Sequence, residues 1–392
     1  MPSLPISRRT IVLLVFATVI SLLIVFNIDT GRSYLATING QGSLKNIKNS
    51  TLGFQQIFVV NLKSRTDRRD GMALAASYTG LDLTFTEAVT EVSEKALPPS
   101  GSEQSMSKGA FGDWRSHLNI ARRMVEENIQ TALIMEDDVD WDIRIHEQLM
   151  EFAQASQLLL QPTLGTKDEF LDPTYHGDLG DLNPKTFYVG EQKVTPPTTS
   201  PYGDVDKWDM LWLGHCGATI PTGKDDSKTP LARAVVLNDN TVPEKQHINL
   251  EISSPAYRDD YPAHSRVVFR TGGNVCTLAY ALTNAGARRL LYELGVQALQ
   301  GAIDTELDSW CRGRSGRSMH TCLTVGPQYF QHHRPAGRWG SMSDIGDMPT
   351  HYNDFAFTTN IRWSTRVNLP KLVSGDTNYT DMFRDGEPAT GL

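Results

Sequence analysis

The sequence has few cysteines, no excess of positive charge and no internal repeat. Its four cysteines are Cys216, Cys276, Cys311 and Cys322, and none belongs to a C-x-x-C pair, which disfavours a zinc site. Lys and Arg number 37 against 45 Asp and Glu, for a formal net charge of −8. This balance argues against nucleic acid as a partner, because binding the phosphate backbone of a nucleic acid needs a basic protein surface. With 40% hydrophobic residues, the 392-residue chain has a globular composition, not a disordered one.

A long hydrophobic run stands at the N-terminus, from Ile11 to Ile28, and carries no charged residue. At the helical rise it covers about 27 Å, close to the hydrocarbon core of a bilayer. Arg8 and Arg9 precede it, so the positive-inside rule predicts a type II signal anchor with a cytosolic tail at 1–10 and the rest of the chain in a lumen. The alternative is a signal peptide cleaved near Leu35-Ala36, which exports the same residues.

Two features suit an oxidising lumen. Asn49-Ser50-Thr51 and Asn378-Tyr379-Thr380 are sequons for N-glycosylation. The even number of cysteines allows one or two disulfides, and the short separation favours Cys311–Cys322 as a local link, with the full connectivity left open. Residues 29–53 are polar and show no lasting apolar period, so they predict a stem between membrane and domain.

From residue 54 onward, strand-like and helix-like patterns alternate. Strands are predicted at 56–62, 83–88, 131–135, 208–213, 275–283 and 322–330, and helices from 66 and at 113–128, 284–294 and 302–311. The alternation predicts an α/β domain at 54–346, with a mostly parallel central sheet flanked by helices. Turn-rich composition predicts long irregular insertions at about 161–207 and 220–266, and an irregular tail at 347–392.

Three consecutive carboxylates, Glu136, Asp137 and Asp138, follow the strand predicted at 131–135. Open α/β sheets bind ligands at the carboxyl ends of their strands. Two such charges ~4 Å apart repel by ~4 kcal/mol at an effective dielectric of 20, and a Mg²⁺ or Mn²⁺ ion would remove that cost. On the motif alone, a solvated acidic turn is the more ordinary interpretation.

Four segments, in order and at matching spacing, carry a resemblance to one family. They are IFVVNLKSRTDRR at 57–69, GAFGDWRSHL at 109–118, ALIMEDDV at 132–139, and TLAYALTNAGARRLL at 277–291 with Asp304 beyond it. The chain resembles glycosyltransferase family 25, which holds bacterial lipooligosaccharide galactosyltransferases, collagen galactosyltransferases and fungal members, and a fungal-type membrane form is expected. Two departures leave the acceptor unidentified: Asp113 stands where many relatives have a cysteine, and the insertions are long.

The resemblance implies a GT-A-like fold and inverting transfer of a hexose from a UDP-sugar, usually UDP-galactose, to a glycan or glycoprotein acceptor. It implies a catalytic domain in the lumen of the Golgi or endoplasmic reticulum. The acidic triplet then corresponds to a DxD-type motif for Mn²⁺ or Mg²⁺, with Asp138 as first metal ligand and Asp137 or Glu136 on metal or ribose. A cation on the leaving diphosphate would stabilise the transition state more than the ground state.

The implied donor site gathers residues from the first strand and the two segments after it. They are Asn61, Leu62, Arg65, Arg68, Gly109, Gly112, Ser116 and His117. Arginine forks suit a diphosphate, although a solvated helix start with Asp67 as partner explains the arginines as well. The glycines either admit the donor to the backbone or form a turn before the helix. His117 is either donor support or a structural histidine.

An inverting transfer needs a base on the face opposite the departing diphosphate. Asp304 is the candidate, with Glu306 and Asp308 as near alternatives and an acidic helix start as the structural interpretation. A later cluster, Gln331-His332-His333-Arg334 with Ser343-Asp344, offers His332 or His333 as a further metal ligand, or solvated loop histidines. Two other function classes stay open: a glycoside hydrolase, and an inactive lumenal protein that binds a sugar nucleotide or glycan.

Overall fold

The computed structural model describes residues 42–100, 106–177, 183–223, 228–338, 343–346 and 352–389. Within those ranges, no helix has both the length and the apolar character needed to cross a bilayer. The predicted cytosolic tail at 1–10 and span at 11–28 lie outside the described residues, and so does the predicted stem up to residue 41.

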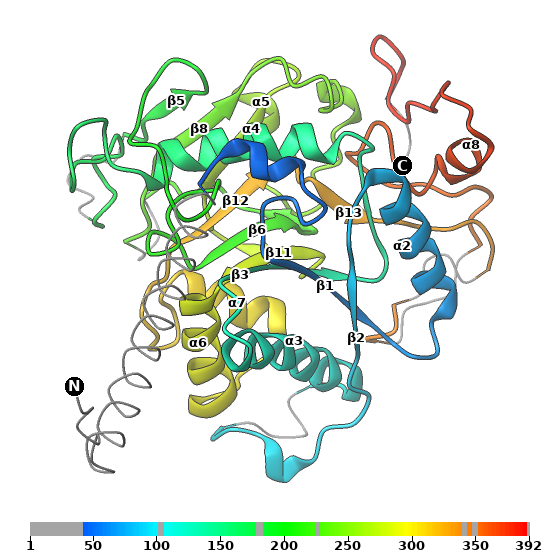
Figure 1. Ribbon diagram of the computed structural model, residues 1–392, viewed down its shortest axis with the longest axis horizontal. Coiled ribbons are helices and arrows are strands. Elements are labelled where there is room, and N and C mark those ends of the chain that lie inside the picture. Colours follow the sequence, from blue (N-terminus) through cyan, green and yellow to red (C-terminus); the bar gives the residue numbers. More distant parts are fainter. Residues whose placement is uncertain are drawn as a thin grey trace, which may run out of the picture.

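A mixed sheet runs through the described molecule, with helices on both faces (Figure 1). In spatial order its strands are β2 (Thr84–Glu87), β1 (Gln56–Asn61), β3 (Thr131–Glu136), β11 (Ala279–Thr283), β6 (Met210–Gly214), β12 (Cys322–Gly326), β9 (Arg266–Arg270), β8 (Arg233–Val236) and β5 (Thr186–Tyr188). β1 is parallel to β2 and β3, whereas β11 is antiparallel to β3 and β6. β4 (Val139–Trp141) pairs with β13 (Phe330–His332), which adjoins β6. The expected α/β class is confirmed.

The helices divide between the two faces of the sheet. They are α2 (Thr66–Thr79), α3 (Lys108–Glu126), α4 (Ile145–Leu160), α5 (Ala256–Asp259), α6 (Asn284–Tyr292), α7 (Ile303–Cys311) and α8 (Leu369–Ser374), with short turns at η1 (Leu44–Lys48), η2 (Glu94–Ala96), η3 (Lys245–His247) and η4 (Glu293–Gln297). In Figure 1, α4 lies above the sheet, and α3, α6 and α7 lie below it. A ribbon of β7 (Gly217–Ala218) and β10 (Asn274–Val275) stands apart from the main sheet.

Alternate residues of the central strands enter two different cores. Ile57 and Val59 of β1 pack with α2 and α4, whereas Phe58 and Val60 pack with α3. β3 divides its apolar side chains in the same way. A strand buried on both faces needs apolar residues at every position, which explains the uninterrupted apolar runs in the sequence. The runs stop at Asn61 and Glu136, so both strands present polar groups at the same edge of the sheet.

Helix α3 begins at Lys108, earlier than the predicted start at 113, with the Ser107 hydroxyl accepting the Ala110 amide at 3.1 Å. Gly109 and Gly112 therefore lie inside its first turns, which corrects the interpretation as a turn before the helix. A Cβ on Gly109 would stand 2.2 Å from the Ile345 carbonyl oxygen, and one on Gly112 would stand 2.2 Å from that of Val89. Both glycines thus permit close approach of another chain segment.

Two regions are more ordered than the sequence predicts. Residues 42–53, expected in the stem, pack onto the domain, where Ile47 and Leu52 are fully buried. The regions expected to be irregular insertions supply β5 and β8, which extend the sheet beyond β9. These strands have three and four residues, and such short runs show no clear period. The 16-residue α4 has no counterpart among the predicted helices.

The expected irregular tail is ordered where it is described. Residues 352–389 contain α8, and Ser364, Thr365 and Asn368 are at most 1% exposed. The Ser364 hydroxyl donates to Asp140, just beyond the acidic triplet. This C-terminal segment therefore packs against the β3–β4 connection.

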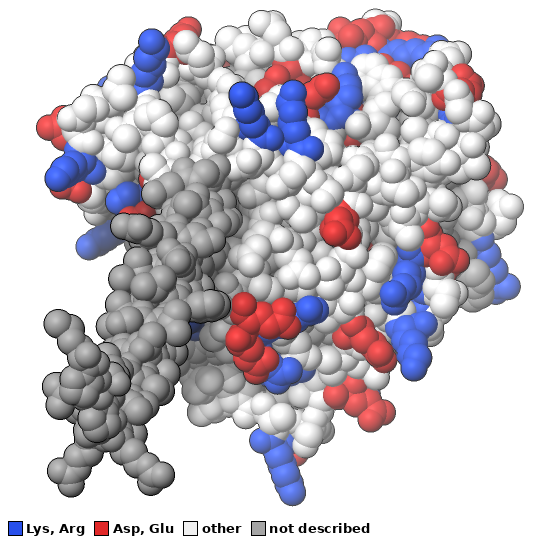
Figure 2. All heavy atoms as spheres, in the orientation of Figure 1, with Lys and Arg blue, Asp and Glu red and all other residues white. Residues whose placement is uncertain are grey.

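Two disulfides link the four cysteines. Cys311–Cys322 is present, which confirms the predicted local link, and it joins the end of α7 to the start of β12. The second disulfide joins Cys216, just before β7, to Cys276, just after β10, at one end of the β7–β10 ribbon. On the face shown in Figure 2, the described acidic and basic side chains are interspersed in small groups, in keeping with the nearly balanced charge counts.

Candidate active site

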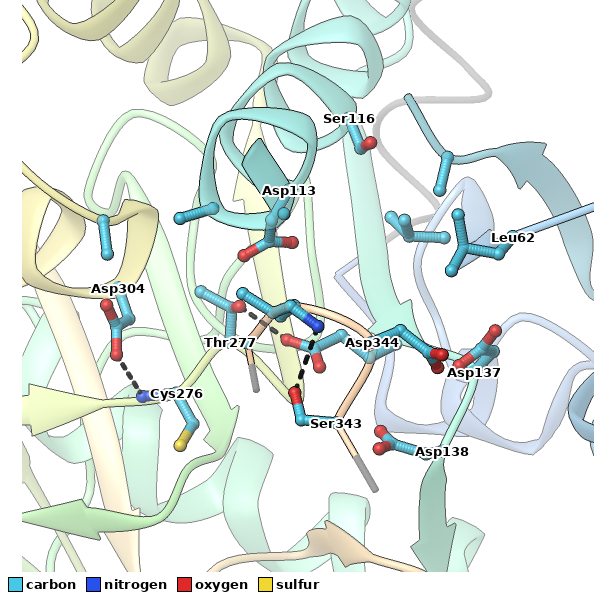
Figure 3. A pocket seen from close by; sticks show the side chains of 18 of the residues that line it. Leu62, Asp113, Ser116, Asp137, Asp138, Cys276, Thr277, Asp304, Ser343 and Asp344 are labelled. Carbon is cyan, nitrogen blue, oxygen red and sulfur yellow. Dashed lines mark hydrogen bonds between the residues drawn. The ribbon is translucent and has the colours of Figure 1, made fainter. Parts of the chain in front are cut away.

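A cavity of about 720 Å³ opens at the carboxyl ends of β1 and β3 (Figure 3). Nine of the predicted site residues line it: Leu62, Arg68, Gly109, Ser116, Glu136, Asp137, Asp138, Asp304 and His332. The four sequence segments, which are far apart along the chain, therefore meet around one hollow. This convergence is what a shared binding site requires.

The remaining predicted residues lie behind the lining or at its margin. Asn61 is 3% exposed, and its amide nitrogen donates to Asp137 Oδ2 at 2.7 Å. Gly112 contacts the chain at Val89, as described above. His117 is fully buried, with Nδ1 at 2.9 Å from the Tyr280 hydroxyl and Nε2 at 3.2 Å from Asp113 Oδ1. His117 is thus placed to support Asp113, not to contact a ligand directly.

Arg68 is the cation at the centre of the acidic triplet. Its guanidinium lies 2.7 Å from Asp137 Oδ1 and 3.4 Å from Asp138 Oδ2, and its side chain is only 13% exposed. Burial alone would lower the pKa of Arg68, but the Asp138 and Asp137 carboxylates outweigh burial and raise it. The interpretation of the arginines as a solvated helix start is therefore wrong for Arg68. For Arg65, the pairing with Asp67 that this interpretation predicted is present.

Asp344 pairs with both Arg65 and Arg68. Its carboxylate bonds to Arg65 and lies 3.3 Å from Arg68. Arg334 approaches Asp138 Oδ2 at 3.7 Å and also lines the cavity. The sequence cluster around 331–344 contains both residues, but its histidines, not Arg334 or Asp344, carried the functional prediction. Three arginines, Arg65, Arg68 and Arg334, thus lie near the acidic triplet. The Asp344 carboxylate bridges Arg65 and Arg68.

Asp138 has one oxygen that nothing in the described part of the chain satisfies. Oδ2 faces Arg68 and Arg334, whereas Oδ1 is buried without a hydrogen-bond partner among the described residues. Burial alone would raise the pKa of Asp138, but His332, Arg68 and Arg334 hold it at about 2, so the group is ionised at neutral pH. A buried anionic oxygen without a donor is costly, and a bound cation would relieve that cost.

The donor set fits a divalent ion that takes few protein ligands. Both oxygens of Asp137 are engaged, one by Asn61 and one by Arg68, which leaves Asp138 Oδ1 as the open ligand atom. Burial lowers the pKa of His332 to about 4, so its imidazole is neutral and able to coordinate. In the described chain, the one trio of His and acidic ligand atoms already within reach of a common ion is Glu244, His264 and Asp385, outside the cavity lining. An ion at Asp138 would need substrate oxygens and water to complete its shell, as Mg²⁺ commonly does.

Glu136 and Asp113 form a more acidic part of the cavity wall. The Thr277 hydroxyl donates to Glu136 Oε1 at 2.6 Å. Burial, with the charges of Asp113 and Asp138, raises the pKa of Glu136 well above its usual value. Asp113 points into the cavity in Figure 3 and was not predicted as a site residue. The available signal was its place four residues before His117 on the same helix.

Asp304 is the member of its acidic segment that reaches the cavity. It stands in the first turn of α7, where Oδ1 accepts the Thr305 amide at 2.7 Å and Oδ2 accepts the Cys276 amide at 3.0 Å. Glu306 pairs with Arg317, and Asp308 accepts the Asn274 amide; neither lines the cavity. The geometry therefore separates Asp304 from its two sequence alternatives.

Arg366 supports the triplet from behind, and no sequence signal pointed to it. Its Nη1 donates to the carbonyl oxygens of Asp137 and Val139, each at 3.2 Å. Gly71 on α2 leaves the necessary room, since a Cβ there would lie 2.7 Å from Arg366 Nη2. A cation placed against these carbonyls fixes the backbone turn that delivers the carboxylates.

An apolar flank completes the cavity. Val60, Leu62, Ala88, Val89 and Ala110 line it between β1, the end of β2 and the start of α3. Ser116 links the segment after β2 to α3: its hydroxyl accepts a hydrogen bond from the Val89 amide at 2.8 Å and donates one to the Gly112 carbonyl at 2.6 Å. The cavity thus offers an apolar surface beside a charged one.

Comparison with known proteins matches the N-terminal part of the described domain to one family. Residues 54–193 match the model of glycosyltransferase family 25, described as LPS biosynthesis protein. Procollagen galactosyltransferase 2 of Mus musculus is 27% identical over 119 residues, which are 26% of this chain and 19% of that protein. A glycosyltransferase 25 family member of Anopheles gambiae is 30% identical over 131 residues, 28% of this chain and 22% of its own.

A relative named as inactive shows a comparable identity over a segment of comparable length. Inactive glycosyltransferase 25 family member 3 of Homo sapiens is 27% identical over 125 residues, 28% of this chain and 21% of its own. The matched segments span about a fifth of the length of these curated relatives.

Proposed function

The chain belongs to glycosyltransferase family 25 through its residues 54–193, and on that basis we propose that it is an inverting, metal-dependent glycosyltransferase of GT-A type. It transfers a hexose, galactose in the first instance, from a UDP-sugar to a glycan or glycoprotein acceptor. We place it in the Golgi or endoplasmic reticulum lumen, held by the N-terminal anchor. The observation that carries the proposal is the meeting of Arg68, the acidic triplet and Asp304 at one cavity, with Asn61 holding Asp137 from behind.

The charged side of the cavity suits the diphosphate of the donor. Arg65 and Arg68 already bind the Asp344 carboxylate. A diphosphate has more oxygens and more negative charge than a carboxylate, so it would bind the same two guanidinium groups more strongly. Donor binding would displace Asp344 from them. The apolar flank at Val60, Leu62 and Val89 suits the planar base, while Asn61 holds Asp137 in place.

A divalent ion would be held mainly at Asp138, with His332 as a second protein ligand. Bound there, it would supply positive charge to the leaving diphosphate as the sugar bond breaks. Arg68 and Arg334 add fixed positive charge at the same place without any reorganisation. Arg366 keeps the turn that presents Asp138 in position.

Asp304 takes the proton of the acceptor hydroxyl. It lies across the cavity from Asp137 and Asp138 in Figure 3, as a base on the face opposite the departing diphosphate must. The acceptor oxygen then attacks the anomeric carbon, the bond to the diphosphate breaks, and the configuration inverts. The two backbone amides on Asp304 keep its carboxylate directed into the cavity.

A donor screen on the full-length chain tests this function. Nucleotide release from a panel of UDP-sugars is measured with Mn²⁺ and with chelator, in the parent, in Asp138→Asn and in the exposed control Asp168→Asn. We expect release from one donor only with metal, and a loss of about 10²-fold or more in Asp138→Asn alone. Full activity in Asp138→Asn, shown folded by circular dichroism, would exclude the proposed metal site.

Similarity to an inactive relative supports a second candidate, a lumenal protein that binds the sugar nucleotide without transferring sugar. Calorimetry of UDP with Mn²⁺ distinguishes the two. Binding without nucleotide release from any donor favours the inactive protein, whereas binding with release favours the transferase. Cleavage of glycosides without nucleotide, unaffected by chelator, would instead indicate the hydrolase.

A further inference from the structure

Among the described residues, one hydrogen bond from outside α7 reaches the Asp304 carboxylate. Oδ1 accepts the amide of Thr305, the next residue on α7, so that bond moves with Asp304. Oδ2 accepts the amide of Cys276, which belongs to the connection between β10 and β11 (Figure 3). The position of the carboxylate relative to the residues on β3 is therefore set through Cys276.

Cys276 has a backbone conformation that needs external support. Its φ is 63°, in the left-handed region that side-chain-bearing residues seldom adopt because the Cβ crowds the carbonyl group. Trp212 of β6 donates its indole N–H to the Cys276 carbonyl at 2.9 Å. The Cys276 sulfur is bonded to Cys216, so the residue is held from its backbone and from its side chain.

Cys216 ties this connection to the central sheet. It lies two residues beyond the end of β6, and its amide donates to the Val275 carbonyl at 2.9 Å, extending the β7–β10 ribbon. The two cysteine Cα atoms are 5.5 Å apart, and both residues line the cavity. The other disulfide differs: Cys311 and Cys322 are 3% and 2% exposed and do not line the cavity.

We propose that the Cys216–Cys276 disulfide is a positioning element of the active site. It fixes the Cys276 backbone in the conformation that points its amide at Asp304, and so sets the direction of the base toward the acceptor hydroxyl. This role rests on the proposed function, because it concerns the base of the transfer. It predicts an effect on turnover and not on donor binding, since the donor contacts lie on β1, α2 and the triplet.

Two double variants of the full-length chain separate positioning from stability. C216S/C276S and C311S/C322S each remove one disulfide, and both are assayed where circular dichroism shows them folded. We expect kcat to fall by about 10²-fold in C216S/C276S, the scale of a misplacement near 1 Å, with donor KM and UDP affinity unchanged. C311S/C322S keeps its kcat although its melting temperature falls. An unchanged kcat in C216S/C276S, or an equal loss in both variants, overturns the proposal.

Hydrogen exchange gives a readout that needs no activity. Amide protection at 274–278 should fall in C216S/C276S and persist in C311S/C322S, because the Cys276 amide loses Asp304. Unchanged protection would overturn the positioning role even if turnover changed. If the parent releases nucleotide from no donor, the proposed function fails, yet the exchange result still decides whether this disulfide holds the Cys276 amide on Asp304.

Selective reduction serves if C216S/C276S does not fold. A water-soluble phosphine should reach the cavity disulfide before the buried one, and mass spectrometry of alkylated peptides identifies which bond opened. Loss of turnover with reduction of Cys216–Cys276, and its return on reoxidation, supports the positioning role. Retained turnover after complete reduction of that bond contradicts it.

Discussion

The two walls of the cavity satisfy their carboxylates in different ways. On the wall formed by β1, α2 and the triplet, Asp137, Asp138 and Asp344 each face an arginine. The other wall is formed by α3, the β10–β11 connection and α7, with Glu136 of the triplet at its edge. Its acids accept hydrogen bonds from neutral donors: the Thr277 hydroxyl for Glu136, and the amides of Cys276 and Thr305 for Asp304. The first wall carries its own cations, whereas the second concentrates negative charge.

This difference assigns the walls to different substrates. Arginines that already bind carboxylates suit an anionic ligand, because the oxygens of the ligand can replace the carboxylate oxygens as hydrogen-bond acceptors. Carboxylates met only by neutral donors suit hydroxyl groups, which donate hydrogen bonds and bring no charge. The arginine wall therefore fits the diphosphate of the donor, and the acidic wall fits the hydroxyls of an acceptor. Variants on each wall should separate donor binding from turnover.

Arg68→Met should have the largest effect because it breaks the arginine wall. It leaves Asp137 and Asp138 buried without their main cation, and a broken buried ion pair costs about 3 kcal/mol or more. We expect a lower denaturant midpoint and a donor KM raised by more than about 10-fold. Arg122→Met, at an exposed helix position, is the matched control. Donor KM equal to the parent's in folded protein would mean that this wall does not hold the diphosphate.

Asp304→Asn tests the acidic wall and should act on turnover alone. An amide keeps the shape and the acceptor oxygen but cannot take the acceptor's proton, so kcat should fall by about 10²-fold or more. Donor affinity, measured by calorimetry with UDP and Mn²⁺, should stay at the parent's value. The exposed Asp354→Asn is the control. A variant that weakens UDP binding while sparing kcat would reverse the assignment of the two walls.

The sequence predicted the centre of the fold well and its margins poorly. β1 and β3 were found because both faces are buried, which produces long apolar runs that a short strand such as β8 does not have. Helix α4 has no side-chain cap at Arg144 and buries the polar residues Gln148 and Ser156. The Gln148 amide nitrogen donates to Thr241, and the Ser156 hydroxyl donates to the Tyr202 carbonyl, partners that the local pattern does not reveal.

In the candidate site too, some residues could be predicted from the sequence and others could not. Asp138 was predicted as a site residue from the strand end before it and Asp304 from the family resemblance, and both line the cavity. Asp344 and Arg366 act through contacts between segments far apart in the chain, so their roles appear only once the chain is folded. Asp113 was seen only as a departure from the family pattern, although it shares the cavity with Glu136. Positions on regular elements were thus predictable, and the charge pairs between elements were not.

A raised carboxyl pKa does not by itself mark the acidic wall, and Glu151 allows a small test of that point. Burial, with the Asp239 charge, raises the pKa of Glu151 to about 7, although the residue lies on α4 outside the cavity lining. The folded state then binds this proton more tightly than the unfolded chain does, so the stability that Glu151 itself contributes is full below about pH 4.5 and is lost as the pH rises toward 7. Glu151→Gln should remove this contribution, gaining about 1 kcal/mol at pH 8 after discounting solvent screening and nothing at pH 4.5. Urea midpoints at the two pH values measure it, and nucleotide release should stay unchanged, since an effect on turnover would extend the functional acids beyond the cavity.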